Sequence, residues 1–189
     1  SITSIRLAQT KSKAMRQRFD GSAPAETLLA VPGRPIDELV WLPNGKTVVI
    51  RTGSGGSGSR DVQAFTFGVD SAVRPIAASP YDEFGADVSP DGRWVAYVSN
   101  ESGRAEVFVR NLSDPGAGRT QVSVDGGEEP RWAPSGRELF FRSGRGAMLV
   151  AEVTVGAAIS VRALRTLFLT PNLTTDPFSR AYDISRDDR

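Results

Sequence analysis

One pattern recurs along this chain at a spacing of about 45 residues, and a fixed period of that size indicates a repeat architecture. Each copy has an apolar pair flanking a polar residue, a Pro-x-Gly turn, a basic residue and a hydrophobic strand. The copies are ELVWLPNGKTVVIR (38–51), GADVSPDGRWVAYV (85–98) and EPRWAPSGRELFFR (129–142). A degenerate fourth copy, AYDISRDDR (181–189), has Arg186 in place of the proline and Asp188 in place of the glycine.

The turn in each copy has a physical explanation. In Ser89-Pro90-Asp91-Gly92, proline sets φ for the second position of a type I turn, aspartate tolerates the third, and glycine accepts positive φ at the fourth. The stretches 42–45 and 133–136 repeat that order. Each turn is therefore predicted to join two antiparallel strands.

Two further strands are predicted in each unit. The third lies at 61–67, 105–111 and 147–154, and the fourth at about 72–77, 119–124 and 159–168. Four antiparallel strands repeating at about 45 residues are typical of β-propeller blades. The sequence thus predicts an all-β fold, a β-propeller of four-stranded antiparallel blades. It forms a single domain over 1–189, with repeats at about 31–77, 78–124 and 125–170.

The two ends of the chain complete this count to about four blades. Residues 2–9, 14–19 and 26–30 are predicted as the second, third and fourth strands of a unit that lacks its innermost strand, and 181–185 resembles an innermost strand. Residues 1–30 and 178–189 then form a composite or partial blade, which would hide two open sheet edges. Alternatively, the chain is half of a larger ring completed by a second copy, as a homodimer, or a fragment of a longer protein.

The glycine-rich stretch RTGSGGSGSR (51–60) contains a formal G-x-G-x-x-G pattern at 53–58. A dinucleotide site needs a helix next, because the pyrophosphate is held by free N–H groups at a helix N-terminus. The residues that follow, 60–67, are rich in β-branched and aromatic side chains, which favours a strand. We interpret 51–60 as a hairpin loop.

Composition excludes several function classes. The chain has no histidine and no cysteine, so it assembles neither a Ser-His-Asp nor a Cys-His nucleophile, and no thiolate or imidazole metal site. Its net charge of +1 does not indicate a nucleic-acid partner, and no apolar run is long enough for membrane insertion. We expect no cofactor, no metal and no catalytic residue.

The stretches DEFGADVSPDGRWVAYVSNESGRAEVFVRNL and GGEEPRWAPSGRELFFRSG resemble the WD-like propeller repeats of the TolB type. Such repeats are found in bacterial periplasmic binding proteins, in propeller domains of some peptidases and in sensor regions of some bacterial kinases. The resemblance covers about residues 26–170. It implies a protein-binding or ligand-sensing module of bacterial origin, favours a periplasmic or other extracytoplasmic location, and carries over no catalytic residue.

These observations predict a non-catalytic propeller scaffold that binds a protein or peptide partner through its loops. The alternative is a sensor or gating domain of a bacterial kinase or peptidase, and a less favoured third is a small-ligand or cation-binding, lyase-like enzyme. Residues on and before the innermost strands are the candidate site, with Tyr81 and Phe84 expected at an exposed face. The charged candidates are Asp82, Glu83, Asp87, Glu128 and Glu129, with Arg131 as a counter-charge.

Overall fold

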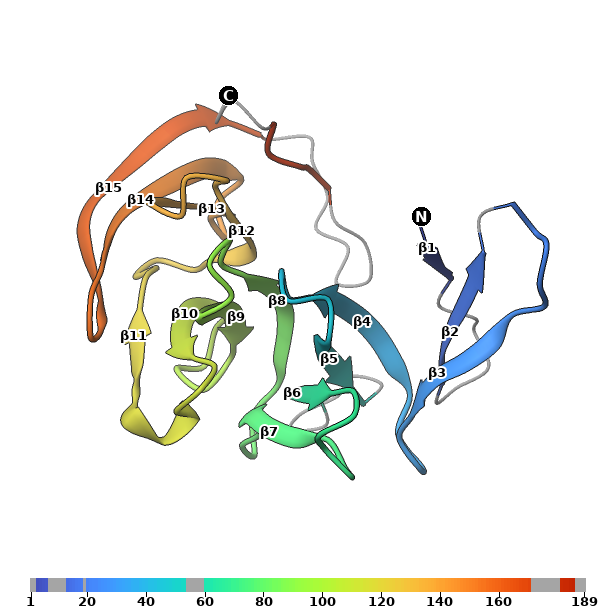
Figure 1. The fold of residues 1–189 in the computed structure, drawn as a ribbon. Helices are drawn as coiled ribbons and strands as arrows, with labels where there is room; N and C mark the ends of the chain where they lie inside the picture. Colours follow the sequence, from blue (N-terminus) through green and yellow to red (C-terminus); the bar gives the residue numbers. More distant parts are fainter. Residues whose placement is uncertain (1–2, 7–12, 19, 54–59, 171–180, 186–189) are drawn as a thin grey trace.

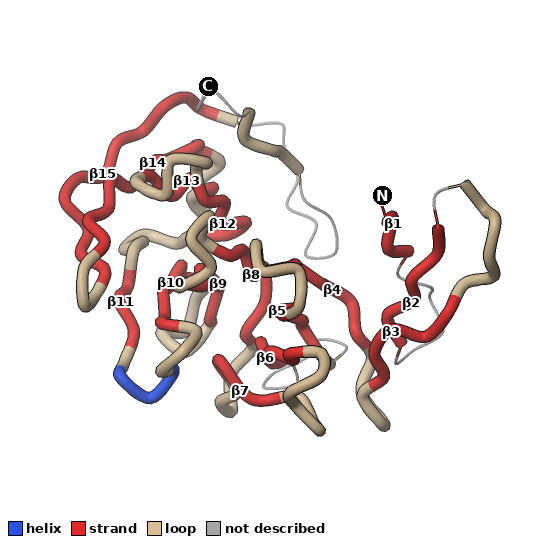
Figure 2. The backbone as a smooth tube through the Cα atoms, in the orientation of Figure 1, coloured by secondary structure: helices blue, strands red, loops and turns tan. Residues whose placement is uncertain are grey.

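The fold consists almost entirely of β-strands, as predicted. The computed structural model describes residues 3–6 (backbone only), 13–18, 20–53, 60–170 and 181–185. Figure 2 shows that this described part consists of strands, connecting loops and one short helical turn, η1 (Pro115–Ala117). The strands are β1 (Thr3–Arg6), β2 (Lys13–Arg18), β3 (Glu26–Ala30), β4 (Ile36–Trp41), β5 (Thr47–Thr52), β6 (Asp61–Thr66), β7 (Arg74–Ala77), β8 (Glu83–Val88), β9 (Trp94–Ser99), β10 (Glu106–Asn111), β11 (Arg119–Gln121), β12 (Glu128–Trp132), β13 (Glu138–Arg142), β14 (Ala147–Val155) and β15 (Ile159–Leu169).

The strands form four antiparallel sheets in chain order. The first sheet is β1-β2-β3, the second β4-β5-β6-β7, the third β8-β9-β10-β11 and the fourth β12-β13-β14-β15. The sheets follow one another around an arc, and β4, β8 and β12 lie nearest its centre (Figure 1). Each sheet contacts the next through these innermost strands. This arrangement confirms the predicted propeller.

The middle strands carry the core because neighbouring sheets cover both of their faces. All six residues of β5 and all six of β9 are buried, which explains why the second strand of each repeat is a continuous apolar run rather than an alternating one. Trp132 is buried between the third and fourth sheets. Trp41, at the same repeat position, packs with its ring centroid 5.6 Å from that of Phe67. Trp132 is therefore a core residue, whereas Trp41 is partly buried against the core.

The Pro-x-Gly turns of successive sheets lie against each other. A Cβ atom at Gly92 would be 3.3 Å from Cδ of Pro43 in the preceding turn, and one at Gly136 would be 3.7 Å from Cδ of Pro90. Both glycines have positive φ, as the turn model requires. The repeat in sequence is therefore also a repeat in space.

Each innermost strand of the last three sheets contains an irregularity near its start. The register shifts fall between Ile36 and Glu38 in β4, Phe84 and Asp87 in β8, and Glu128 and Arg131 in β12. Bulges of this kind re-aim side chains and end regular pairing. The equivalent point in each of the last three sheets therefore presents side chains away from the regular pleat.

The ends of the chain differ from the regular sheets. The first sheet has three strands, and residues 181–185 form no strand; they contact the fourth sheet through Tyr182 and Ile184. Parts of the predicted composite blade, at 1–2, 7–12, 19, 178–180 and 186–189, lie outside the described residues. Closure within one chain and completion by a second copy both stay predictions. The mass in solution distinguishes them: 20.3 kDa for one chain, or twice that for a pair.

Two other sequence inferences concern helices. Of the glycine-rich stretch, residues 54–59 lie outside the described residues, and the segment after it is the strand β6, as predicted, rather than a helix. In the parts of the chain that the structure describes, no helix has the length and apolarity needed to cross a membrane.

Candidate functional site

The predicted site residues gather where the innermost strands begin. Tyr81 and Asp82 precede β8, and Glu83, Phe84 and Asp87 belong to it. Glu128, Glu129 and Arg131 belong to β12, which contacts β8 in the neighbouring sheet. Because the Pro-x-Gly turns follow the ends of these strands, the site and the turns lie on opposite faces of the arc. We call this set the strand-start face.

The two aromatic candidates have different environments. Tyr81 is exposed, with 45% of its surface accessible. Phe84 is 9% exposed, belongs to the core between the third and fourth sheets, and lies beneath the guanidinium of Arg60, 4.0 Å from the ring centroid. The expectation that Phe84 is exposed is therefore wrong. Its position in β8 turns the ring inward, whereas Tyr81 lies in the loop before the strand.

The acids beside Tyr81 are buried and satisfied. Asp82 accepts hydrogen bonds from the backbone N–H and the Nη2 of Arg60, at 3.3 and 3.1 Å. Glu83 accepts from the backbone N–H of Ser79 at 3.2 Å and from its hydroxyl. Burial raises the pKa of Glu83 above its ordinary value of 4.5. These two carboxylates support the loop that carries Tyr81 rather than facing solvent.

Asp87 connects the third sheet to the fourth. It accepts a hydrogen bond from the backbone N–H of Trp132 at 2.9 Å, and its other oxygen lies 3.3 Å from Nη1 of Arg131. Nη2 of Arg131 donates to Asp183. Burial raises the pKa of Asp87, and the hydrogen bond from Arg131 lowers that of Asp183. These three charges occupy the same repeat position in successive copies of the motif.

Glu128 and Glu129 begin β12, and they differ in environment. Burial, and then the neighbouring Glu129, raise the pKa of Glu128. Glu129 has φ of +54°, the one positive φ among the described non-glycine residues. Its Oε1 lies 3.2 Å from Nη1 of the buried Arg142, and its Oε2 has no hydrogen-bond partner among the described residues. Left-handed backbone is costly for such a residue, and strained positions of this kind cluster at functional sites.

Sequence reasoning missed three residues that complete this face. Arg60 covers Phe84 and binds Asp82, and Arg142 binds Glu129. Tyr182 donates its hydroxyl to the backbone carbonyl of Glu129 at 2.6 Å, and burial raises its pKa. The match between 181–189 and the repeat motif was a signal for Tyr182. No comparable signal existed for the arginines, because their partners come from other strands.

The face combines an exposed aromatic ring with fixed charges. No group of three or more histidine, cysteine, aspartate or glutamate side chains suited to a metal ion is found within the described ranges. Four acids of the strand-start face are instead held by arginines or by backbone N–H groups: Asp82, Glu83, Asp87 and Glu129. Such an arrangement gives a rigid, charged surface around one exposed aromatic ring.

These features define a β-propeller with an ordered charged face. No family model and no curated protein matches the sequence. Solved structures do match the fold: TolB from Acinetobacter baumannii has a TM-score of 0.63 at 12% identity over 89% of this chain, and a TolB-like protein described as putative TolB from Agrobacterium tumefaciens has 0.62 at 17% over 89%. The tricorn protease has 0.57 at 12% over 82%.

The likeness establishes the fold, which is that of TolB-type propellers. The chain spans 40% and 62% of the length of the two TolB structures and 17% of the tricorn protease. The resemblance inferred from the repeat motif is thus confirmed in three dimensions at low sequence identity.

Proposed function

We propose that this protein is a non-catalytic scaffold that binds a protein or peptide partner at the strand-start face. The observation that carries the proposal is the environment of Tyr81. Its ring is 45% exposed, while Asp82 and Glu83 beside it are buried and hydrogen bonded. An exposed aromatic side chain on a rigid support loses little conformational freedom on binding, and tyrosine is enriched among residues that dominate interfaces.

The surrounding charges support the same function. Glu128 and Arg131 are partly exposed beside this surface, and charged groups at the rim of an interface set specificity more than affinity. The fold is similar to that of the TolB structures, and this similarity supports a function in which the propeller binds a partner through its surface. Phe84 is buried beneath Arg60, so it supports this surface from below and does not contact the partner.

Capture of partners on the immobilised chain, followed by quantitative mass spectrometry, tests the proposal. We expect a protein retained by the native chain to be lost with Tyr81→Ala, because the aromatic anchor is removed. Val69→Ala is the matched control, since Val69 is 78% exposed but lies in the loop between β6 and β7. Equal retention by the native chain and the Tyr81→Ala variant would refute the site.

The second candidate is a sensor or gating domain attached to a bacterial kinase or peptidase. The match to a region that makes up 17% of the tricorn protease chain favours it, because there the same fold is part of a larger protease. A kinase or hydrolase segment in the same reading frame would support this function. In that case the strand-start face contacts the catalytic part rather than a separate protein.

A further inference from the structure

The fourth sheet differs from the other sheets at the face where the turns lie. In the last three sheets an equivalent backbone hydrogen bond joins the third strand, or the residue directly after it, to the residue after the turn glycine: Phe67 N to Lys46 O at 2.9 Å, Leu112 N to Arg93 O at 2.9 Å, and Val153 N to Arg137 O at 2.8 Å. Beyond this point the second and third sheets leave strand structure. In the fourth, β14 continues to Val155 and returns as β15 from Ile159.

This extension is a two-stranded ribbon with a fixed tip. Arg93 of the third sheet donates to the carbonyl of Gly156 at 3.3 Å, and the hydroxyl of Thr120 donates to the carbonyl of Ile159 at 3.0 Å. The ribbon therefore extends past the start of β13 and is anchored on the preceding sheet. On the side of β13, its backbone has no partner among the described residues beyond Val153, whose N–H bonds the carbonyl of Arg137.

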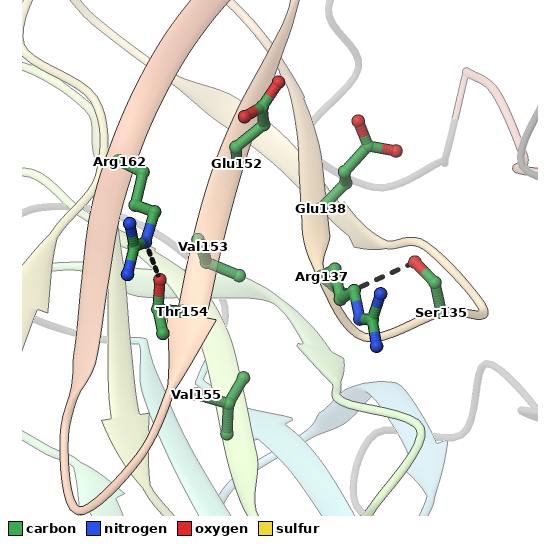
Figure 3. A pocket seen from close by; sticks show the side chains of 8 residues that line it. All are labelled: Ser135, Arg137, Glu138, Glu152, Val153, Thr154, Val155 and Arg162. Atoms are coloured by element: carbon green, nitrogen blue, oxygen red, sulfur yellow. Dashed lines mark hydrogen bonds between the residues drawn. The ribbon is translucent and has the colours of Figure 1, made fainter.

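A groove separates the ribbon from the turns. Its larger part, about 720 Å³, is lined by Ser135, Arg137, Glu138, Glu152, Val153, Thr154, Val155 and Arg162 (Figure 3). A smaller part of about 400 Å³ shares Ser135, Arg137 and Val155 and continues to the Ser89-Pro90-Asp91 turn of the third sheet. Figure 3 shows Val153 and Val155 pointing from β14 toward the side where Arg137 lies.

In the described part of this groove, the carboxylates are held in ion pairs, whereas two guanidinium groups are not. Glu138 and Glu152 both contact Arg165, at 3.4 and 3.3 Å, so their carboxylates are already engaged. Arg162 donates through Nε to the hydroxyl of Thr154. No hydrogen bond or ion pair joins the exposed guanidinium of Arg137 to another described residue. Two arginines therefore offer donors to a ligand, and guanidinium groups match carboxylates in geometry.

We propose that this groove binds an extended acidic segment of a partner protein. The segment lies along β14 at Thr154 and Val155 and adds backbone hydrogen bonds where β13 is absent. Its acidic side chains meet Arg137 and Arg162, and its other side chains cover Val155, which is 37% exposed, whereas Val153 is already buried in the core. This surface is separate from the strand-start face, because it adjoins the turns that follow the innermost strands.

Fluorescence anisotropy with a capped, labelled eight-residue peptide of alternating glutamate and valine tests the proposal, with matched peptides carrying glutamine or lysine instead. We expect the glutamate peptide to bind about tenfold more tightly than the glutamine peptide at low salt, and the lysine peptide not to bind. Joint substitution Arg137→Gln and Arg162→Gln should weaken binding of the glutamate peptide about tenfold. Methylation of alternate backbone nitrogens should also weaken it, since those groups could no longer donate.

Arg145→Gln is the control for loss of one positive charge, because Arg145 lies in the loop between β13 and β14 and is not part of the groove. Joint Arg137→Glu and Arg162→Glu should reverse the preference toward the lysine peptide, which a merely unfolded variant would not do. Equal binding of the glutamate and glutamine peptides, or an equal effect of Arg145→Gln, overturns the proposal. Dimerisation of the native chain that the joint glutamine variant abolishes would assign the groove to a second copy and also overturn it.

Discussion

The carboxylate of Asp87 in β8 accepts a hydrogen bond from the backbone N–H of Trp132 in β12, at 2.9 Å. An acid in one sheet thereby satisfies a backbone donor in the next sheet. Glu38 of β4 does the same for Gly85 of β8, also at 2.9 Å. Each contact between the last three sheets thus combines apolar packing with a carboxylate that accepts from the neighbouring strand, and this carboxylate is buried at Asp87 and half-buried at Glu38.

Asp87→Asn should therefore destabilise the protein. The amide retains one acceptor, but it loses the charge opposite Arg131 and one of its two acceptor oxygens, and such losses cost about 1–3 kcal/mol for buried groups. Urea unfolding followed by tryptophan fluorescence measures the change. Asp114→Asn is the matched control, because Asp114 is exposed and makes no side-chain capping bond at η1. A change of the same size in both variants would contradict the role of Asp87.

The contact between successive turns predicts a difference between two equivalent glycines. Gly45 and Gly92 occupy the same turn position with φ of +63° and +71°, so alanine should cost about 1–2 kcal/mol at either from backbone strain alone. A Cβ at Gly45 would meet nothing within 4 Å, whereas one at Gly92 would be 3.3 Å from Pro43. Gly92→Ala should therefore lower the thermal midpoint more than Gly45→Ala. Equal thermal midpoints for the two variants would mean that the turn containing Gly92 is not in steric contact with the turn containing Pro43.

Arg51 should be among the most sensitive positions in the protein. Its guanidinium is fully buried and lies 2.7 Å from Glu38 and 3.2 Å from Asp37. Arg51→Met leaves these carboxylates without their counter-charge. Because both carboxylates are partly exposed, the loss should lie near the lower end of the range of about 3–5 kcal/mol that breaking a fully buried pair costs. In the double variant Arg51→Met with Glu38→Gln, part of that loss should be recovered, because the glutamine still accepts from Gly85. Chemical unfolding of the two single variants and the double variant measures the coupling, and additive losses would rule it out.

Glu83 predicts a pH dependence of stability. Burial raises its pKa in the folded protein above 4.5, so the folded state binds the proton more readily than the unfolded chain. Its contribution to stability is present below the unfolded pKa and is lost as pH rises through the folded pKa. The free energy of unfolding of Glu83→Gln, relative to the native chain, should accordingly increase between pH 4 and pH 7. A constant difference over that interval would show that the two pKa values are alike.

The architecture could be predicted from the sequence because each blade of a propeller is built from the same kind of turn and the same strand pattern. Each unit needs the same turn, so proline and glycine recur at Pro43-Gly45, Pro90-Gly92 and Pro134-Gly136. Each middle strand is covered on both faces, so its apolar run is continuous. Most predicted strands consequently match the observed ones within a few residues. The predicted strand at 119–124 is shorter in the structure, at Arg119–Gln121, because the hydroxyl of Ser123 bonds the backbone N–H of Val107 and Glu106 in place of regular pairing.

Only part of the candidate site could be predicted from the sequence. The gathering of acids at the starts of innermost strands follows from the repeat, and so does the exposure of Tyr81 in the preceding loop. The burial of Phe84 does not, because Arg60, which precedes β6 in the second sheet, covers it. Likewise, the groove beside β14 depends on how far one hairpin extends beyond its sheet, and the length of a strand pair is a weak signal in sequence.

The sequence by itself determined the repeated turn, the strand order and the apolar middle strands, because each depends on residues that are neighbours in the chain. Only the tertiary structure decided which charges meet: Asp87 with Trp132 and Arg131, Arg142 with Glu129, and Tyr182 with the carbonyl of Glu129. These contacts join residues 13 to 53 positions apart, which lie in different strands or in the segment after β15. Their partners are selected by the packing of one strand or sheet on another, and no local pattern records that packing.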